Sequence, residues 1–553
     1  MSFDTHEISN QFDELSDYNL YATDTPLREA LAQAGAQGFA PRLQHYCEKL
    51  GSAATFELGQ VANEHTPELQ THDRRGRRID RVDFHPAWHE LMAMYRNAGF
   101  ISLPFDDEQR GRWSAWAAAF YLHTQVEAGV LCPATMTQAA IPVVQKEPAL
   151  WAQLKDKLMS TGYDPRDIPL EQKKSIWVGM GMTEKQGGSD VRANTTTATP
   201  VGAGGRGAEY SIRGHKWFFS APMCDAHLVV AKTPDGGPSC FWVPRWRPDG
   251  RKNEVRVQRL KQKVGNKSNA SSEVEFQDAY GILMGEEGRG IPTIIEMATF
   301  TRLNCVVGSA GMVRQALVQA IAYTRQRKAF GRKLAEQPLM RAVLADVALE
   351  SEGNVALMMR LAQAYENSLN GQASAVERAW MRVMTPAAKF WVCKRAVEIG
   401  GEMMEVFGGN GYVDNGIMAR LFREMPVNSI WEGSGNVMCL DVMRAIGREP
   451  DALFALIGEL AEVAAGEPRL AAEVQALREM MATPPDQLEA LGRRFAQRLV
   501  LLAQACLLRR HAPALVADAF IATRLDGQWG RIVGAVDTRG IDVEALLQRA
   551  LPA

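Results

Sequence analysis

The sequence lacks the features that would indicate an extracellular, metal-binding or membrane protein. Its eight cysteines form no C-x-x-C pair, and their spacing suggests no metal cage. Scattered single thiols are typical of a reducing compartment rather than of a disulfide framework. No apolar run approaches the roughly 18 residues of a membrane span. The first ten residues contain neither a basic nor an apolar leader region. We therefore expect a cytoplasmic protein without a metal site.

An excess of charge is also missing, since 62 Lys and Arg face 64 Asp and Glu. This balance argues against nucleic-acid binding by the whole surface but allows one local basic face. The cations after Arg448 are all Arg, and from Leu491 onward nine Arg stand against five acids. Guanidinium groups suit phosphate oxygens, although a solvated or salt-bridged helical face is the commoner explanation. The candidate phosphate contacts are Arg444, Arg448, Arg494, Arg498, Arg509 and Arg510.

Periodicity divides the chain into four segments. Residues 1–180 and 283–446 carry apolar residues at helical spacing, whereas 181–282 contains short β-branched or aromatic runs between Gly, Pro, Asn and Asp clusters. Another helical segment, 447–553, follows. The predicted fold is therefore α+β: an N-terminal helical domain, a central β-sandwich or barrel, a helical bundle, and an extra C-terminal helical domain.

Individual residues allow more specific predictions within the bundle and the β segment. The bundle should contain helices near 312–327, 339–369 and 376–407, and Pro386 should bend or break the last of them. In the β segment, Gly202-Ala-Gly-Gly-Arg-Gly207 matches the G-x-G-x-x-G pattern of dinucleotide-binding proteins. A strand pattern rather than a helix follows it, so this segment is interpreted as a hairpin turn.

One acid, Glu432, lies between an apolar-aromatic pair and a small-residue turn. Ile430 and Trp431 can exclude water there, and the following glycines allow a backbone to approach a ligand closely. A helix is expected next, so its first N–H groups should point back toward the turn. Burial can raise a carboxyl pKa toward working pH, as a general base requires. A solvated acid in a helix-entry loop is the commoner alternative for this stretch alone.

Two other stretches have the composition of a ligand site. The segment 179–190 places paired glycines and hydroxyl or acid side chains on a loop, which could bind a phosphate or a flat polar ligand but could also be a plain β-turn. In the second stretch, Arg327 suits a pyrophosphate, Phe330 suits a ring face, and Gly331 suits a helix end.

Four motifs, in this order, resemble those of acyl-CoA dehydrogenases. They are Met182-Thr-Glu-Lys-Gln-Gly-Gly-Ser-Asp190, Arg327-Lys-Ala-Phe-Gly331, Phe407-Gly-Gly-Asn-Gly411 and Trp431-Glu-Gly-Ser434. The resemblance covers residues from about 40 to 446 and includes the order of helical and β segments. The extensions at both ends, and residues 263–276, resemble more specifically the AidB subfamily. These proteins are bacterial flavoproteins of the adaptive response to DNA alkylation, and they bind double-stranded DNA.

The resemblance implies FAD as cofactor and gives a role to each matching residue. Glu432 matches the base that removes the α-proton of an acyl-CoA while hydride passes to flavin N5. Thr301 stands where isovaleryl-type relatives carry that base, and Thr is no base, so Glu432 is the sole candidate. Phe218 matches the ring that covers the flavin. The implied FAD contacts are Met182, Thr183, Gly188, Ser189, Phe218, Phe219, Ser220, Arg327, Phe330, Glu405, Gly408, Gly409, Ser434 and Asn436.

The resemblance also implies partners. Arg327 and Phe330 match residues that reach the FAD of a neighbouring subunit, so a homo-oligomer is expected, usually a tetramer in this family. Two properties are expected together: weak dehydrogenase activity on an isovaleryl-like acyl-CoA, and binding of double-stranded DNA without strong sequence specificity. The alternative is a genuine short- or branched-chain acyl-CoA dehydrogenase with no DNA role.

Overall fold

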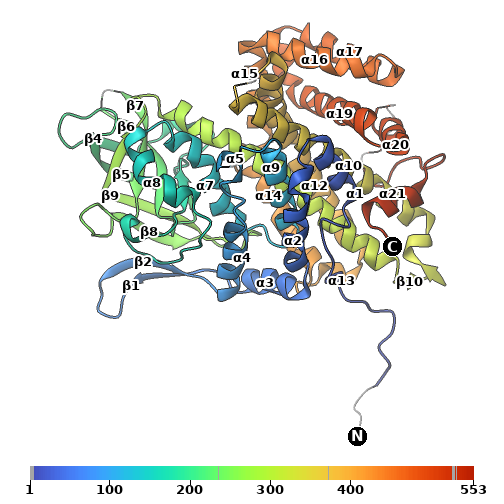
Figure 1. Cartoon of the computed structure of the whole chain (residues 1–553), viewed down its shortest axis with the longest axis horizontal. Coiled ribbons are helices and arrows are strands. Elements are labelled where there is room, and N and C mark those ends of the chain that lie inside the picture. The colour runs from blue at the N-terminus through green and yellow to red at the C-terminus, as the bar shows by residue number, and fades with distance from the viewer. Residues whose placement is uncertain (1–4, 107, 235, 372, 526–529, 531) are drawn as a thin grey trace. The chain divides into compact units, whose positions relative to one another are not determined.

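The computed structural model describes residues 5–106, 108–234, 236–371, 373–525, 530 and 532–553, with the side chains of 485 and 486 excepted. The chain forms two compact units from interleaved segments (Figure 1). The sheet unit consists of Glu57–Gln109 and Glu127–Asn304. The bundle unit consists of the described residues up to Phe56, Arg110–Val126 and those from Cys305 onward.

The sheet unit contains a seven-stranded sheet in the order β3-β5-β4-β6-β7-β9-β8. An additional antiparallel pairing of β5 with β9 closes this sheet on itself, in agreement with the predicted β domain. The strands are β3 (Val178–Gly181), β4 (Thr197–Pro200), β5 (Glu209–Ser220), β6 (Ala226–Thr233), β7 (Gly237–Pro244), β8 (Val255–Leu260) and β9 (Ser271–Met284).

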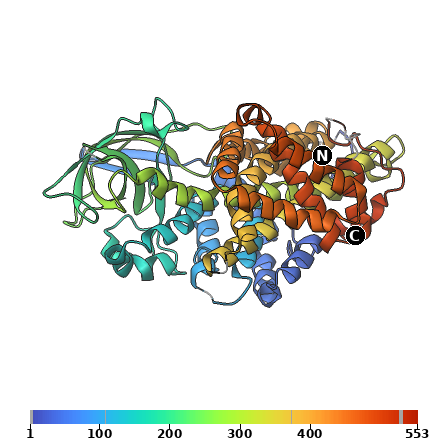
Figure 2. The same cartoon turned by 90° about the horizontal axis from the view of Figure 1, so that it is seen from above.

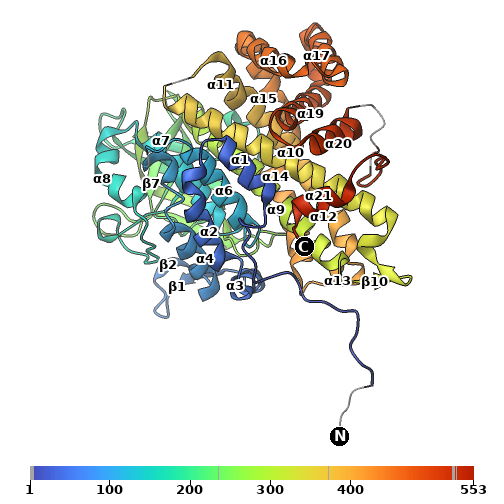
Figure 3. The same cartoon turned by 45° about the vertical axis from the view of Figure 1, so that its right-hand side comes forward.

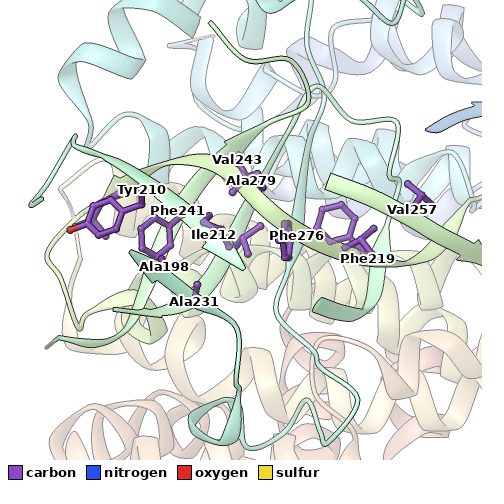
Figure 4. Packing of buried hydrophobic residues seen from close by; sticks show 13 residues of the cluster. Ala198, Tyr210, Ile212, Phe219, Ala231, Phe241, Val243, Val257, Phe276 and Ala279 are labelled. Carbon is purple, nitrogen blue, oxygen red and sulfur yellow. The ribbon is translucent and has the colours of Figure 1, made fainter. Parts of the chain in front are cut away.

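The core of this sheet consists of buried apolar side chains from several strands. Tyr210, Ile212 and Phe219 of β5 meet Phe241 of β7 and Phe276 of β9 in one buried cluster (Figure 4). Every second residue of a strand points to the same face, and a register shift between Lys216 and Phe219 brings Phe219 to the face that Tyr210 and Ile212 share. The turn through Gly202–Gly207 joins β4 to β5, whose residues Pro200 and Tyr210 pair antiparallel. The hairpin interpretation of the G-x-G-x-x-G pattern is therefore confirmed.

The sheet unit also contains helices and one hairpin outside the seven-stranded sheet. The hairpin strands β1 (Glu68–His72) and β2 (Arg78–Asp83) pair antiparallel within a segment expected to be helical. The helices of this unit are α4 (Pro86–Asn97), α5 (Leu103–Asp106), α7 (Leu131–Val144) and α8 (Pro148–Met159), with short 3₁₀ turns at Leu170–Gln172 and Val191–Ala193. Two further helices, α3 (Ala53–Glu64) and α9 (Gly290–Thr324), run from one unit into the other.

The bundle unit is helical except for a small hairpin of β10 (Lys328–Ala329) and β11 (Arg332–Lys333). Its first helices are α1 (Thr25–Gln33), α2 (Ala40–Leu50), α6 (Arg112–Thr124), α10 (Pro338–Leu369), α11 (Ala375–Ala379), α12 (Thr385–Val406), α13 (Gly409–Tyr412), α14 (Ile417–Ile430) and α15 (Gly435–Arg448). The C-terminal helices are α16 (Pro450–Ala464), α17 (Pro468–Met481), α18 (Pro485–Ala490), α19 (Gly492–His511), α20 (Ala514–Arg524) and α21 (Val543–Ala550). Short 3₁₀ turns span Gln37–Phe39 and Leu334–Glu336.

Three predicted bundle helices are present, with two differences. α9 begins at Gly290 instead of near Met312 and continues through Gly308 and Gly311. Gly311 is required for close packing, since a Cβ there would lie 2.5 Å from the Tyr121 carbonyl oxygen. The third helix is interrupted by a π-helical turn, Trp380–Met384, immediately before Pro386. The break predicted at this proline is therefore confirmed.

α9 is the only helix in the described residues with the length and hydropathy of a membrane span. Over 18 residues its mean hydropathy is 1.3, but 94% of that window is buried inside the protein, as in a core helix.

The C-terminal helices pack within the bundle unit. α19 and α21 contact α10, and α17 contacts α16 and α19. The orange and red helices lie together in Figures 2 and 3, with α19, α20 and α21 along α10 in Figure 3. All eight cysteines, each among the described residues, are buried free thiols.

Candidate active site

Glu432 lies in the short turn between α14 and α15. α14 ends at Ile430, and Ser434 is the N-cap of α15. Glu432 has a φ of 60° and Gly433 a φ of 108°, so two consecutive residues adopt left-handed backbone. This conformation costs a non-glycine residue about 1–2 kcal/mol. The surrounding structure must therefore hold the turn in place.

Lys389 of α12 supplies that restraint. Its side chain is 1% exposed, and its ammonium donates to the carbonyl oxygens of Trp431 and Gly433, at 2.6 Å each. These two acceptors flank Glu432, so a single cation fixes the peptide groups on both sides of the acid. Hydrogen bonds to a charged group contribute about 1.5–3 kcal/mol each, which is enough to offset the strain of the turn.

A chain of hydrogen bonds fixes the Trp431 ring beside the acid. Its indole Nε1 donates to Asn428 Oδ1 at 2.9 Å, and Asn428 Nδ2 donates to Ser309 Oγ at 3.1 Å. The thiol of Cys305 lies close enough to both Lys389 and Glu432 for their charges to affect it. Burial raises the pKa of this thiol, the Lys389 ammonium opposes that rise, and the Glu432 carboxylate adds to it. The thiol therefore stays protonated.

The start of α15 contacts residues that lie outside the predicted site. Arg493 of α19 donates from Nε to Asn436 Oδ1 at 2.8 Å, and its guanidinium lies 5.8 Å from the centre of the Phe390 ring. Gly435 faces Lys394, whose Cε would lie 2.5 Å from a Cβ at that position. The C-terminal block thus contacts a residue expected to flank the flavin. No sequence motif marks Arg493, because only the fold brings α19 to α15.

A second group of expected cofactor residues forms around the β10–β11 hairpin. Phe330 is 98% exposed and has a φ of 52°, so the hairpin presents its ring outward. The ring of Tyr323, near the end of α9, stacks on Phe407, near the end of α12, with centroids 4.4 Å apart. This stack joins the Arg327 motif to the following glycine motif, so the structure brings these two distant motifs together.

The surface of this group suits a dinucleotide. Exposed rings of Phe330 and Tyr412 offer stacking faces, and Arg327 offers a guanidinium. A Cβ added at Gly408 or Gly409 would meet nothing within 4 Å, so the backbone there is open to a ligand. Glu405 is exposed one helical turn earlier. Rings, a guanidinium and bare backbone are the features that hold an adenine and a pyrophosphate, and these residues therefore fit the ADP half of FAD.

A third group lies in the sheet unit. Gly181 at the end of β3 pairs with Phe219 of β5, so the Met182–Asp190 loop begins beside the Phe218–Ser220 strand end. The Trp217 N–H donates to the Thr183 carbonyl at 2.8 Å, and a Cβ at Gly188 would lie 2.5 Å from Thr183 Oγ1. The glycine therefore lets the loop fold back onto Thr183, while Ser189 remains exposed.

Glu184 anchors this loop from inside. Its carboxylate accepts from Lys216 Nζ at 2.7 Å and from the N–H groups of Thr195 and Thr196 at 2.6 and 3.2 Å. Burial alone would raise the pKa of Glu184, but the Lys216 ammonium and these donors lower it from 4.5 to about 2. Glu184 is thus an ionised structural residue.

Adjacent phenylalanines of β5 have different environments. Phe218 is 52% exposed and can cover a flat ring, in line with its expected role. Phe219 is 2% exposed and stacks on His227 at 3.8 Å within the sheet core, so its side chain is not available to a cofactor. Neighbouring residues of a strand point to opposite faces, and the register shift between Lys216 and Phe219 makes Phe219 the ring that points into the core. Thr301 donates its hydroxyl to the Ala298 carbonyl within α9 at 3.0 Å.

The six candidate phosphate-binding arginines divide into two sets. Arg498 pairs with Glu473 at 3.0 Å, Arg509 with Asp518 at 2.7 Å, and Arg510 with Glu459 at 3.8 Å. The other three, Arg444, Arg448 and Arg494, are exposed and have no ion pair with any residue that the structure describes. The commoner explanation, a salt-bridged helical face, therefore applies to half of them.

Comparison with known proteins identifies the family. The chain matches the Adaptive response protein AidB N-terminal domain over residues 10–165, the acyl-CoA dehydrogenase middle domain over 179–279, and the acyl-CoA dehydrogenase C-terminal domain over 288–447. It is 45% identical over 532 residues to the AidB protein of Escherichia coli (strain K12), a match that covers 96% of both chains. The chain belongs to the acyl-CoA dehydrogenase family, in its AidB branch.

Solved structures agree with this assignment. Caenorhabditis elegans ACDH-11, solved in complex with C11-CoA, shares 25% identity with a TM-score of 0.84 and covers 99% of this chain and 93% of its own. An acyl-CoA dehydrogenase of Bacillus anthracis, solved complexed with FAD, shares the fold at 18% identity, with a TM-score of 0.63 and coverage of 84% and 81%. FAD is the cofactor of this family, and the AidB branch adds its own N-terminal domain to the shared plan.

Proposed function

We propose that this protein is an FAD-dependent acyl-CoA dehydrogenase of the AidB branch, with Glu432 as its catalytic base. The observation that carries the proposal is the restrained turn: Lys389 holds both peptide groups around an acid with left-handed backbone. Strained backbone that the fold over-determines is characteristic of functional sites. Glu432 also follows a fixed aromatic ring and precedes the N-terminus of α15.

The proposed reaction needs a base and a restrained substrate. FAD, when bound, supplies the ring system that accepts hydride. The carboxylate of Glu432 takes the α-proton of the thioester, and its fixed backbone limits the directions in which it can point. The ring of Trp431 excludes water from one side of the turn, which keeps the carboxylate basic. Arg327, Phe330, Gly408 and Gly409 are proposed to hold the ADP half of FAD, and Met182, Thr183, Gly188, Ser189 and Ser220 its flavin half or the acyl thioester.

The proposed substrate is an acyl-CoA of short or branched chain, such as isovaleryl-CoA, with slow turnover. The complex of ACDH-11 with C11-CoA supports an acyl-CoA ligand for a protein of this fold. The exposed Phe330 ring supports a homo-oligomer, because a ring 98% exposed on a hairpin is suited to contact with a second subunit. We propose a tetramer in which this hairpin reaches a neighbouring subunit's FAD.

The substitution Glu432→Gln tests the base. It removes the proton acceptor while preserving size and the capacity to hydrogen-bond. We expect the variant to keep stoichiometric FAD and to lose anaerobic bleaching of the flavin by isovaleryl-CoA by at least about 10³-fold. Glu449→Gln, an exposed acid just after α15, is the matched control and should bleach as the parent does. Equal bleaching by Glu432→Gln and the parent would remove Glu432 from this role.

Binding of double-stranded DNA is a second proposed property. It rests on Arg444, Arg448 and Arg494, whose guanidinium groups are exposed without an ion pair in the described structure. Each such group can neutralise one phosphate and release its counterion, without reading base identity. The resemblance to AidB supports a role in the response to DNA alkylation, in which this face would hold the protein on duplex DNA.

A salt titration tests the DNA proposal. We expect the association constant for duplex DNA to fall as salt rises, and Arg444→Gln with Arg448→Gln to reduce the log–log slope by about 2. Arg539→Gln is the control, because Arg539 is exposed in the same C-terminal block but pairs with Asp537 at 2.7 Å. An affinity that does not change with salt would overturn the proposal.

A further inference from the structure

The described N-terminal segment lies against the residues that fit the ADP half of FAD. We call Asn10–Tyr18 the N-terminal arm. In Figures 1 and 3 it passes close to α13. Most of its residues are exposed, and Phe12, an apolar residue, is 38% exposed. Burial of apolar surface therefore holds this arm only weakly, and its position depends on specific hydrogen bonds.

Asn10 joins the arm to the hairpin. Asn10 Nδ2 donates to the Lys328 carbonyl at 2.8 Å, and the Lys328 N–H donates to Asn10 Oδ1 at 2.8 Å. Arg327 also donates to the Asn10 carbonyl through Nη1. Only a primary amide both donates and accepts in this way, and Asn tolerates the left-handed φ of 56° found here better than other non-glycine residues. Asparagine therefore suits position 10 both in its hydrogen bonds and in its backbone conformation.

The next residues of the arm contact the other segments of the site. Asn410, in the glycine motif, donates to Gln11 Oε1 at 3.0 Å. Glu14 accepts from the Ile417 N–H at 2.6 Å, at the first residue of α14, and the other end of α14 leads to Glu432. Two adjacent arm residues thus connect the hairpin to the glycine motif, and a third fixes the helix that carries the base.

A second reciprocal pair fixes the arm to α9. Gln319 accepts from the Leu15 N–H and donates to the Leu15 carbonyl, both at 2.8 Å. Tyr18 donates its hydroxyl to Gln315 Oε1 at 2.9 Å, one turn earlier on the same helix. The arm therefore has one fixed path over the cofactor motifs.

We propose that the N-terminal arm is a positioning element of the FAD site: Asn10 and Gln11 hold the Arg327 hairpin and the Gly408–Gly409 loop at the spacing that grips the adenosine diphosphate. This inference rests on the proposed function. The arm lies within the AidB-type N-terminal domain, whose match begins at residue 10, and outside the acyl-CoA dehydrogenase matches. It gives the AidB branch a way of holding cofactor that those two domains lack.

The test is FAD affinity, measured by titrating apoprotein with FAD and following the quenching of flavin fluorescence. We expect Asn10→Ala to raise the Kd for FAD about tenfold and Gln11→Ala about threefold, as the loss of two hydrogen bonds and of one would give. Asn19→Ala, one residue past the arm, is the control, because its side chain bonds the backbone of Tyr21, Ala22 and Gln44 and no residue of a cofactor motif.

A second measurement separates positioning from general stability. The thermal midpoint of the apoprotein should fall no more in Asn10→Ala than in Asn19→Ala, while only Asn10→Ala loses FAD affinity. Equal Kd values in the parent and both arm variants would overturn the arm's role and leave the proposed function standing. A parent that fails to bind FAD at all would overturn the proposed function together with this inference. If Asn10→Ala does not fold, Gln11→Ala alone decides, because Gln11 is exposed and contacts a single side chain.

Discussion

Replacing Lys389 by Met should disable the catalytic turn while leaving the fold intact. Met has a similar volume and shape, so α12 keeps its packing. What is lost is the ammonium that donates to the carbonyls of Trp431 and Gly433 at 2.6 Å each. The perturbation therefore removes the restraint on Glu432 without touching the carboxylate.

The magnitude follows from two opposing contributions. Two hydrogen bonds from a charged donor are worth about 3–6 kcal/mol together. Removing a buried ammonium also removes its desolvation penalty, which is several kcal/mol, so the free energy of unfolding should fall by only about 1–3 kcal/mol. Once released, Glu432 can leave its φ of 60° and recover the 1–2 kcal/mol of strain. The competent turn would then be populated about 5–30-fold less.

Stopped-flow reduction of the flavin by acyl-CoA measures this effect. We expect the limiting rate of flavin bleaching in Lys389→Met to fall by about the same 5–30-fold, with little change in FAD content. Lys394→Met is the control, because Lys394 also lies in α12 and faces Gly435 but donates to neither carbonyl. A Lys389→Met protein that reduces its flavin at the parent rate would refute the argument that this cation holds the base.

Two further predictions concern the supports of the site. Glu184, with its pKa lowered from 4.5 to about 2, contributes stability that is present above pH 4.5 and lost as pH falls toward 2. Urea unfolding at a series of pH values should show this loss of stability in the parent but not in Glu184→Gln. The variant should already be about 3 kcal/mol less stable at pH 7, because Lys216 stays buried without its counter-ion. Identical pH profiles in the two proteins would contradict this. Arg493→Ala should shift the flavin absorbance spectrum by freeing Asn436, whereas Arg494→Ala, its exposed neighbour, should not; a shift in neither would place Asn436 away from the cofactor.

The sequence predicted the fold most reliably where apolar periodicity was strong. The long helices, the closed sheet and the break near Pro386 all follow from patterns in which burial dictates the residue type. The β1–β2 hairpin was missed because Arg78-Ile-Asp-Arg-Val-Asp83 is charged at most positions, so it resembles a solvated segment.

The motifs indicated the site, but its supports had no motif. Glu432 and Arg327 could be singled out because their neighbours form recognisable stretches. Lys389, Arg493 and Asn10 could not, because each acts across many residues of sequence and the partner is a backbone carbonyl or an amide. Phe219 was assigned to the cofactor because a motif gives residue identity but not the direction of a side chain. Strand register, which only the structure supplies, decides between Phe218 and Phe219.

The π-helical turn at Trp380–Met384 sets the phase of everything after it in α12. Such a turn accommodates one extra residue within a helix, and each residue advances the helix face by about 100°. Deleting one residue between Trp380 and Met384 would therefore let an ordinary helix form with Lys389 and Lys394 still directed toward α15, whereas a deletion between Met384 and Lys389 would rotate both lysines by that angle. The chain should accordingly tolerate the loss of one residue within this turn but not between the turn and Lys389, so that natural variation in length would be confined to Trp380–Met384.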